Sequence, residues 1–110
     1  MTLCIIHKGD KVLLGMKKRG FGQGKWNGFG GKVVPGETVE GAAKRELFEE
    51  CGLVAKKIEK IGAIDFSWDK KPEILEVNIF KVSDFKGQLR ESEEMKPEWF
   101  LVKNIPYESS

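Results

Sequence analysis

Three glutamates in the middle of the chain are spaced so that they can act together. Glu46, Glu49 and Glu50 stand at positions i, i+3 and i+4, and on a helix they fall within an arc of roughly 100°. Like charges at this spacing repel, which destabilises a helix by about 0.2–0.5 kcal/mol per pair. Such a face is either solvated and screened by nearby cations, or it binds a hard divalent cation. Because the clustered donors are oxygens, without clustered His or Cys, the second alternative predicts Mg²⁺ or Mn²⁺ rather than Zn²⁺.

The segment before these glutamates is rich in glycine, basic residues and aromatic residues. Residues 15–36 contain eight glycines, interleaved with four lysines, one arginine and three aromatic residues. This composition is typical of a flexible loop, and equally of a loop whose backbone approaches an anion closely. Lysines and a metal together would neutralise a polyphosphate, and the metal would acidify a bound water. The segment lacks the sequence G-x-x-x-x-G-K-[ST], so it is not a P-loop.

A helix must position the glutamates, and residues 38–51 are predicted to form it. Thr38 is a typical N-cap residue, and Gly52 is typical of the position just beyond a helix. An apolar residue recurs at every fourth position and forms a stripe along one face, namely Val39, Ala43 and Leu47. The glutamate face borders this stripe. Its inner edge is therefore expected to approach the body of the protein.

Strands are predicted on both sides of the helix. Residues 3–6 and 12–14 are apolar runs around Gly9-Asp10, which predicts a β-hairpin. Three further strands are predicted at residues 58–68, 74–82 and 99–102, with a turn at 69–72 and a polar, acidic stretch at 84–97. We expect a sheet against which the apolar stripe of the helix packs.

Length and composition narrow the class of protein. A chain of 110 residues, 40% hydrophobic and 33% charged, predicts one globular domain over residues 1–110. The net charge of +2 is no large basic footprint for DNA. Two cysteines are too few for a disulfide framework and are expected to be reduced thiols. Without an apolar run of about 18 residues or a secretory signal pattern, we expect no membrane association and a cytoplasmic location, with mitochondria or nucleus as alternatives.

The segment from residue 31 to 53 matches a known signature. It reads Gly31-(five residues)-Glu37-(seven residues)-Arg45-Glu46-Leu47-Phe48-Glu49-Glu50-Cys51-Gly52-Leu53. This resembles the Nudix box, G-x5-E-x7-R-E-U-x-E-E-x-G-U with U apolar, at every specified position. Residues 12–22, 25–32, 91–95 and 99–100 are also similar to the animal MutT-type branch of the Nudix hydrolases. That branch hydrolyses oxidised purine nucleoside triphosphates.

The resemblance implies an α/β fold, the Nudix-type α/β/α sandwich around a mixed sheet. The relatives continue past the segment similar to residues 104–107 into a Trp-Pro-Asp-Asp stretch, a second helix and a closing strand. We therefore expect a C-terminally short domain without the C-terminal helix: a fragment, a chain completed by a partner copy, or a naturally short protein. The family implies a monomer, and a bare sheet face would make a dimer the alternative.

The resemblance also implies a magnesium site, with Mn²⁺ as a substitute. The implied ligands are oxygen donors, namely the carbonyl of Gly30 and the carboxylates of Glu46, Glu49, Glu50 and Glu94. Glu46, Glu49 and Glu50, which we call the box glutamates, would be the catalytic residues. Arg45 and Glu37 would brace the loop and helix by ion pairing. The implied reaction is hydrolysis between the α and β phosphates, which releases a nucleoside monophosphate and pyrophosphate. The catalytic base stays open among Glu49, Glu50, Glu94 and another carboxylate.

A nucleoside triphosphate is the implied partner, and no stable nucleic-acid binding is expected. Asn27 resembles the residue that reads the purine edge, and its amide offers both donors and an acceptor. Phe21, Phe66 and Trp68 match aromatic pocket positions, with core packing as the alternative. The other matched substrate-lining positions are Thr2, Leu3, Lys17, Phe29, Gly30, Gly31 and Lys32. A Nudix hydrolase of another nucleoside diphosphate derivative and a non-catalytic nucleotide-binding fragment are the rival functions.

Overall fold

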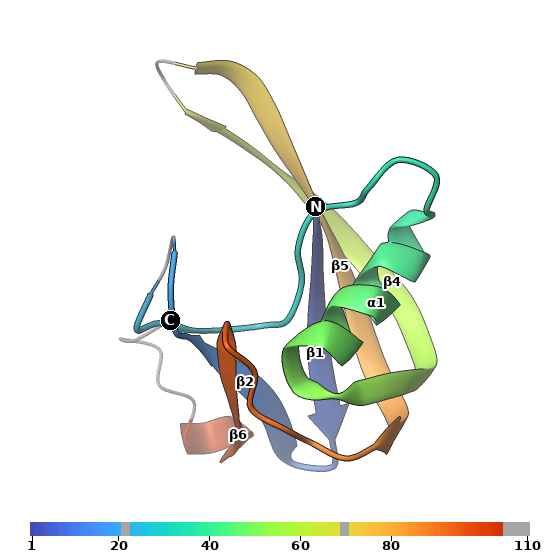
Figure 1. The fold of residues 1–110 in the computed structure, drawn as a ribbon, viewed down its shortest axis with the longest axis vertical. Helices are drawn as coiled ribbons and strands as arrows, with labels where there is room; N and C mark the ends of the chain where they lie inside the picture. Colours follow the sequence, from blue (N-terminus) through green and yellow to red (C-terminus); the bar gives the residue numbers. More distant parts are fainter. Residues whose placement is uncertain (21–22, 69–70, 105–110) are drawn as a thin grey trace.

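The computed structural model describes residues 1–20, 23–68 and 71–104. Its elements, in chain order, are β1 (Thr2–Lys8), β2 (Lys11–Lys17), β3 (Trp26–Asn27), α1 (Val39–Cys51), β4 (Leu53–Trp68), β5 (Lys71–Gly87), β6 (Met95–Leu101) and a 3-10 turn (Val102–Asn104). Figure 1 shows α1 lying across β1, β4 and β5, with the end of β4 and the start of β5 extending beyond the rest of the sheet.

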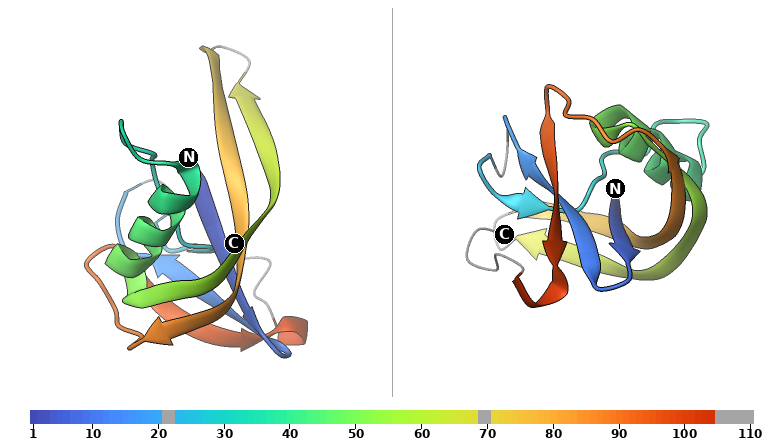
Figure 2. Two further views of the ribbon diagram at one scale, coloured as in Figure 1. Left: turned by 90° about the vertical axis from the view of Figure 1, so that its right-hand side faces the viewer. Right: turned by 90° about the horizontal axis from the view of Figure 1, so that it is seen from below.

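The strands form one mixed sheet. Its order is β3-β2-β1-β5-β4, and β6 pairs with β2. The β1–β5 pair is parallel, and the other pairs are antiparallel. Figure 2 shows α1 packed on one side of this sheet. The predicted α/β class with a mixed sheet is therefore confirmed.

The predicted first hairpin is confirmed, whereas the bounds of the second were wrong. β1 and β2 pair around a turn in which Gly9 has φ +62°. β4 and β5 are longer than the predicted strands 58–68 and 74–82. Their polar ends pair with each other, and this pairing begins where Leu53 lies opposite Gly87. At the other end Trp68 pairs with Lys71, so the strand pairing takes up part of the turn expected at 69–72.

Both ends of the acidic stretch at 84–97 are strand, which the sequence pattern did not indicate. β5 continues to Gly87, and β6 begins at Met95 rather than at residue 99. Met95 is 3% exposed, and β6 pairs with β2 along its whole length. The connection is thereby reduced to residues 88–94, which we call the β5–β6 loop.

The predicted helix and both of its caps are confirmed. The Thr38 hydroxyl accepts a hydrogen bond from the Gly41 N–H at 3.0 Å, and Gly52 ends the helix with φ +81°. The stripe packs into a core composed of Cys4, Ile6, Leu13, Phe29, Ala43, Leu47, Cys51, Leu53, Phe80, Val82 and Met95. Both cysteines are free and buried, as expected of reduced thiols. Within the described part of the chain, no helix has the length and apolar character needed to span a membrane.

Candidate active site

Helix α1 presents its three box glutamates in three different environments. Leu47 faces the core, and Glu50, nearly one turn later, follows it toward the sheet and is only 5% exposed. The side chain of Glu46 is 17% exposed and that of Glu49 is 56% exposed. The expectation that the inner edge of this face approaches the protein body is therefore confirmed at Glu50.

The buried carboxylate of Glu50 is fixed by the backbone of the glycine-rich segment. The Gly30 N–H donates a hydrogen bond to its Oε1 at 2.8 Å. The pKa of Glu50 is raised to about 8, mainly by burial and to a smaller extent by the carboxylates of Glu46 and Glu94, whereas the Gly30 hydrogen bond and Lys17 oppose the rise. This side chain therefore holds or releases a proton near neutral pH.

The Gly30 amide reaches Glu50 because its segment runs against β1. The Thr2 N–H donates to the Gly31 carbonyl at 2.8 Å, and the Phe29 N–H donates to the Cys4 carbonyl at 3.0 Å. A Cβ on Gly30 would lie 1.8 Å from the Thr2 carbonyl oxygen. Only glycine permits this close approach.

Replacing Gly30 with alanine is therefore expected to push the segment away from β1. We expect the free energy of unfolding to fall by about 2–4 kcal/mol, because the added methyl group must displace backbone. Urea unfolding measures the change. Gly62→Ala is the control, since a Cβ there meets nothing within 4 Å and the φ of Gly62 is negative or extended. Equal stabilities of the two variants would contradict the argument.

Arg45 connects the loop and the helix through several carboxylates. Its guanidinium donates to Glu37 at 2.7 and 3.0 Å, to Glu46 at 2.9 Å and to Glu49 at 3.2 Å. It also donates to the Lys32 carbonyl at 3.1 Å. The Arg45 bonds lower the pKa of Glu37 to about 2. The geometry agrees with a bracing role for Arg45 and Glu37, and it adds contacts to two box glutamates that sequence reasoning missed.

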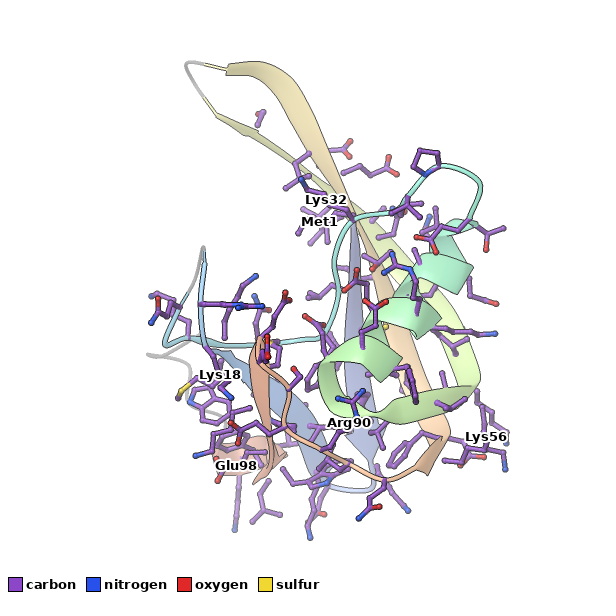
Figure 3. The ribbon with its side chains drawn as sticks, viewed as in Figure 1. Met1, Lys18, Lys32, Lys56, Arg90 and Glu98 are labelled. Carbon is purple, nitrogen blue, oxygen red and sulfur yellow. The ribbon has the colours of Figure 1, made fainter. Side chains whose placement is uncertain are left out.

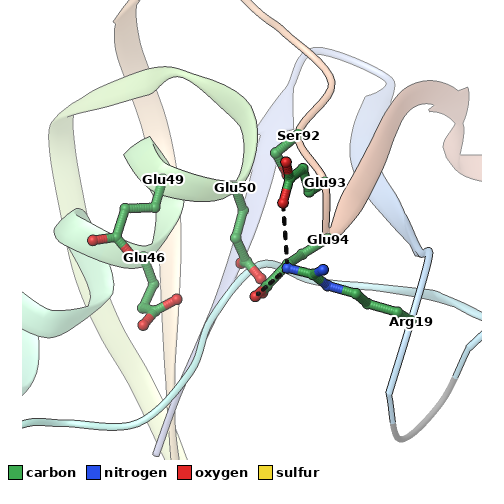
Figure 4. Close-up of a pocket in the computed structure, with 7 residues that line it drawn as sticks. All are labelled: Arg19, Glu46, Glu49, Glu50, Ser92, Glu93 and Glu94. Atoms are coloured by element: carbon green, nitrogen blue, oxygen red, sulfur yellow. Dashed lines mark ion pairs between the residues drawn. The ribbon is translucent and has the colours of Figure 1, made fainter.

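The box glutamates line a pocket together with the β5–β6 loop. Its volume is about 300 Å³, and its lining residues are Arg19, Glu46, Glu49, Glu50, Ser92, Glu93 and Glu94. Figure 4 shows Glu50 directed toward Glu94, and Arg19 reaching in from the opposite side. Arg19 pairs with Glu93 at 3.6 Å and with Glu94 at 3.7 Å. Four of the five predicted metal ligands therefore meet at one pocket.

The donor chemistry of this pocket fits Mg²⁺. Hard divalent cations prefer several carboxylate oxygens, and here the neighbouring carboxylates contribute to the raised pKa of Glu50. In the described residues no three acidic, His or Cys side chains are already gathered as a ligand set. Arg45 pairs with Glu46 and Glu49, and Arg19 pairs with Glu94. Each of these pairings uses one carboxylate oxygen, which leaves the other oxygen of Glu46, Glu49 and Glu94 free.

Several of the residues predicted to contact the substrate lie near the N-terminal end of β1. Thr2 is 1% exposed, and its hydroxyl lies 3.4 Å from the Gly31 carbonyl and amide. Asn27 is exposed, and its Oδ1 accepts from the Gly28 N–H at 2.9 Å. Phe29 is fully buried in the core.

The remaining residues predicted to contact the substrate differ in exposure and in how much of them the structure describes. Leu3 and Lys17 are half-buried, and Lys32 is exposed. Phe21 lies outside the described residues, and for Phe66 and Trp68 the structure describes the backbone within β4.

Sequence reasoning missed three residues of the pocket. Arg19, Ser92 and Glu93 line it alongside the predicted ligands. The basic segment and the acidic run were both visible in the sequence, and they are opposite in charge. Their pairing was not predictable, because more than seventy residues separate them.

The fold is a mixed sheet with a capped helix, and the helix carries the complete signature of residues 31–53 beside a glycine-rich segment. Together these features define a class of protein. The NUDIX domain family matches residues 2–109, and the chain belongs to the Nudix family. It is 51% identical over 107 residues to the oxidized purine nucleoside triphosphate hydrolase of Danio rerio, covering 97% of this chain and 69% of that protein. The Mus musculus protein of the same name is 52% identical over 106 residues, covering 96% and 68%.

Solved structures agree with the fold. A MutT protein from Bacillus halodurans superimposes with a TM-score of 0.77 at 34% identity. The match covers 89% of this chain and 65% of that one. The expected Nudix fold is thereby confirmed.

Proposed function

We propose that this protein is a Mg²⁺-dependent hydrolase of oxidised purine nucleoside triphosphates, which removes them from the nucleotide pool. The observation that carries the proposal is the pocket where Glu46, Glu49 and Glu50 of α1 meet Glu94 of the β5–β6 loop. The two animal relatives described above bear the name of this activity. The reaction adds water across the bond between the α and β phosphates, and the products are a nucleoside monophosphate and pyrophosphate.

The four pocket glutamates and the Gly30 carbonyl would hold the metal. When bound, Mg²⁺ supplies charge neutralisation at the phosphates and a lower pKa for a bound water. Arg45 keeps Glu46 and Glu49 on one side of the pocket through its bond network. The charge of Lys17 acts on Glu50 and lowers the pKa of that carboxyl, and the same ammonium would attract the phosphates of a substrate.

Glu50 is the carboxylate we assign to proton transfer. Its Oε1 is occupied by the Gly30 N–H, which leaves Oε2 to accept a proton from the attacking water. Glu50 also lines the pocket, so its free oxygen faces the space that water and the phosphates would occupy. Asn27, with the aromatic positions Phe21, Phe66 and Trp68, would contact the base.

Pyrophosphate release from a panel of nucleotides tests the proposal. We expect hydrolysis of 8-oxo-dGTP and 2-hydroxy-dATP with Mg²⁺, at kcat/KM values at least about tenfold above that of dGTP. Preferential hydrolysis of ADP-ribose would instead identify a hydrolase of another nucleoside diphosphate derivative. Nucleotide binding by calorimetry without turnover would identify a non-catalytic binding domain. A folded protein that hydrolyses none of these compounds contradicts the proposal.

A further inference from the structure

One arginine fastens the β5–β6 loop to the end of the glutamate helix. The Arg90 N–H donates to the Cys51 carbonyl at 2.9 Å, and its guanidinium donates to the Phe48 carbonyl at 3.1 Å. The guanidinium also lies over the Phe48 ring, 5.6 Å from its centroid. Figure 3 shows Arg90 at the C-terminal end of α1. Three separate contacts therefore join this one residue to the last turn of the helix.

The helix end is built to receive this side chain. The last turn of α1 contains no basic residue, so Arg90 supplies the positive charge that the helix C-terminus favours. Gly52, with φ +81°, follows the helix, and a Cβ there would lie 2.9 Å from Arg90 Cγ and 2.6 Å from the Gln88 carbonyl oxygen. Glycine at this position thus permits the loop to lie directly against the helix end.

The other end of the loop is fastened to the residue that follows β2. The Lys18 N–H donates to the Glu94 carbonyl at 2.8 Å, and the Lys18 ammonium donates to the Ser92 carbonyl at 2.9 Å and to the Glu91 carboxylate. Arg90 lies four residues before Glu94, so the short segment that carries Glu94 is held on both sides. Lys18 holds it to the sheet and Arg90 holds it to the helix.

This fastening opposes a repulsion that the site itself creates. Glu94 and the helix glutamates are acidic side chains that face one pocket. A loop free to move would carry Glu94 away from the helix before a metal arrived. A ligand set drawn from two chain segments loses affinity when those segments are not held together.

We propose that Arg90 is a positioning residue, which holds Glu94 opposite Glu46, Glu49 and Glu50 so that the two segments can bind metal together. The inference rests on the proposed function, because it assumes that these carboxylates bind the metal. This positioning role and a purely electrostatic role of Arg90 predict opposite changes in metal affinity when the side chain is removed. A cation removed from the edge of an acidic site should tighten metal binding, whereas loss of the fastening should weaken it.

Mn²⁺ binding without substrate, followed by electron paramagnetic resonance, tests the proposal. We expect Arg90→Met to raise the dissociation constant for Mn²⁺ about tenfold, and Arg90→Lys, which keeps the charge and one donor, to raise it less. Amide hydrogen exchange of residues 90–94 should quicken in Arg90→Met without metal. In a Glu94→Gln background the same substitution should leave Mn²⁺ affinity unchanged, because the ligand that it positions is absent.

Thr38→Ala is the stability control, since it removes the cap at the opposite end of α1. It should lower the urea midpoint without changing the dissociation constant for Mn²⁺. Unchanged or tighter Mn²⁺ binding in Arg90→Met, or equal weakening in Thr38→Ala, would overturn the role of Arg90 while leaving the proposed function intact. A folded wild-type protein that binds no Mn²⁺ would overturn the metal site, and this proposal with it.

Discussion

Replacing Glu50 with glutamine is expected to reduce turnover of the preferred nucleotide by about 10²–10⁴-fold. The amide retains an oxygen that can accept the Gly30 N–H bond, so the local backbone should stay in place. It removes both the proton acceptor at Oε2 and one negative charge facing the metal. Initial rates of pyrophosphate release with saturating Mg²⁺ measure the loss, and urea unfolding verifies that the variant is folded.

Glu40→Gln provides the matched control for Glu50→Gln. Glu40 lies on the same helix, in its exposed first turn, and pairs with Lys44 at 3.4 Å. Like Glu50→Gln, this substitution removes one negative charge. It breaks an exposed ion pair, which contributes little to stability. We expect its turnover to match that of the wild type. If Glu50→Gln kept more than about a tenth of the wild-type rate, Glu50 would not be the proton acceptor.

The helix and its glutamates could be predicted because their signals are local. Thr38 and Gly52 lie at the two ends of the helix, and the apolar stripe settles which face turns inward. The stripe alone predicts that the inner edge of the glutamate face approaches the body of the protein. The neighbouring residues in sequence contain all the information needed for this part of the site.

The strand bounds could not be predicted in the same way, because tertiary pairing decided them. The stretches 54–57 and 84–86 are short and lysine-containing, which is typical of loops. In the fold they pair with each other at the open end of the β4–β5 hairpin. Met95 looked like part of an acidic loop, yet it fills the core beside β2. Burial of one side chain there outweighs the polarity of its neighbours.

The arginines of the site show the same limit more clearly. A bracing pair of Arg45 with Glu37 was expected, and the loop and helix are near in sequence. Arg19 and Arg90 contact the pocket or its helix across separations of more than forty residues. No periodicity marks such contacts, and only the assembled sheet brings these segments together.

The free energy of unfolding of the metal-free protein is expected to depend on pH through Glu50. Because burial raises its pKa from an ordinary value of 4.5 to about 8, the folded protein binds this proton more tightly than the unfolded chain does. Stability due to this group is therefore fully present below pH 4.5 and is lost as the pH rises through 8. The loss should reach about 4–5 kcal/mol, because each pH unit between the two pKa values costs about 1.4 kcal/mol.

Urea unfolding in EDTA between about pH 5 and pH 9 isolates this dependence when wild type and Glu50→Gln are compared. The glutamine has no proton to lose, so its stability relative to the wild type should increase up to about pH 8 and then level off. Adding Mg²⁺ at the alkaline end should restore the wild type and affect Glu50→Gln less, because a cation that binds the folded state stabilises the ionised carboxylate. Parallel stability curves for the two proteins in EDTA would show that the burial of Glu50 does not control its proton, and the assignment of proton transfer to Glu50 would then lose its physical basis.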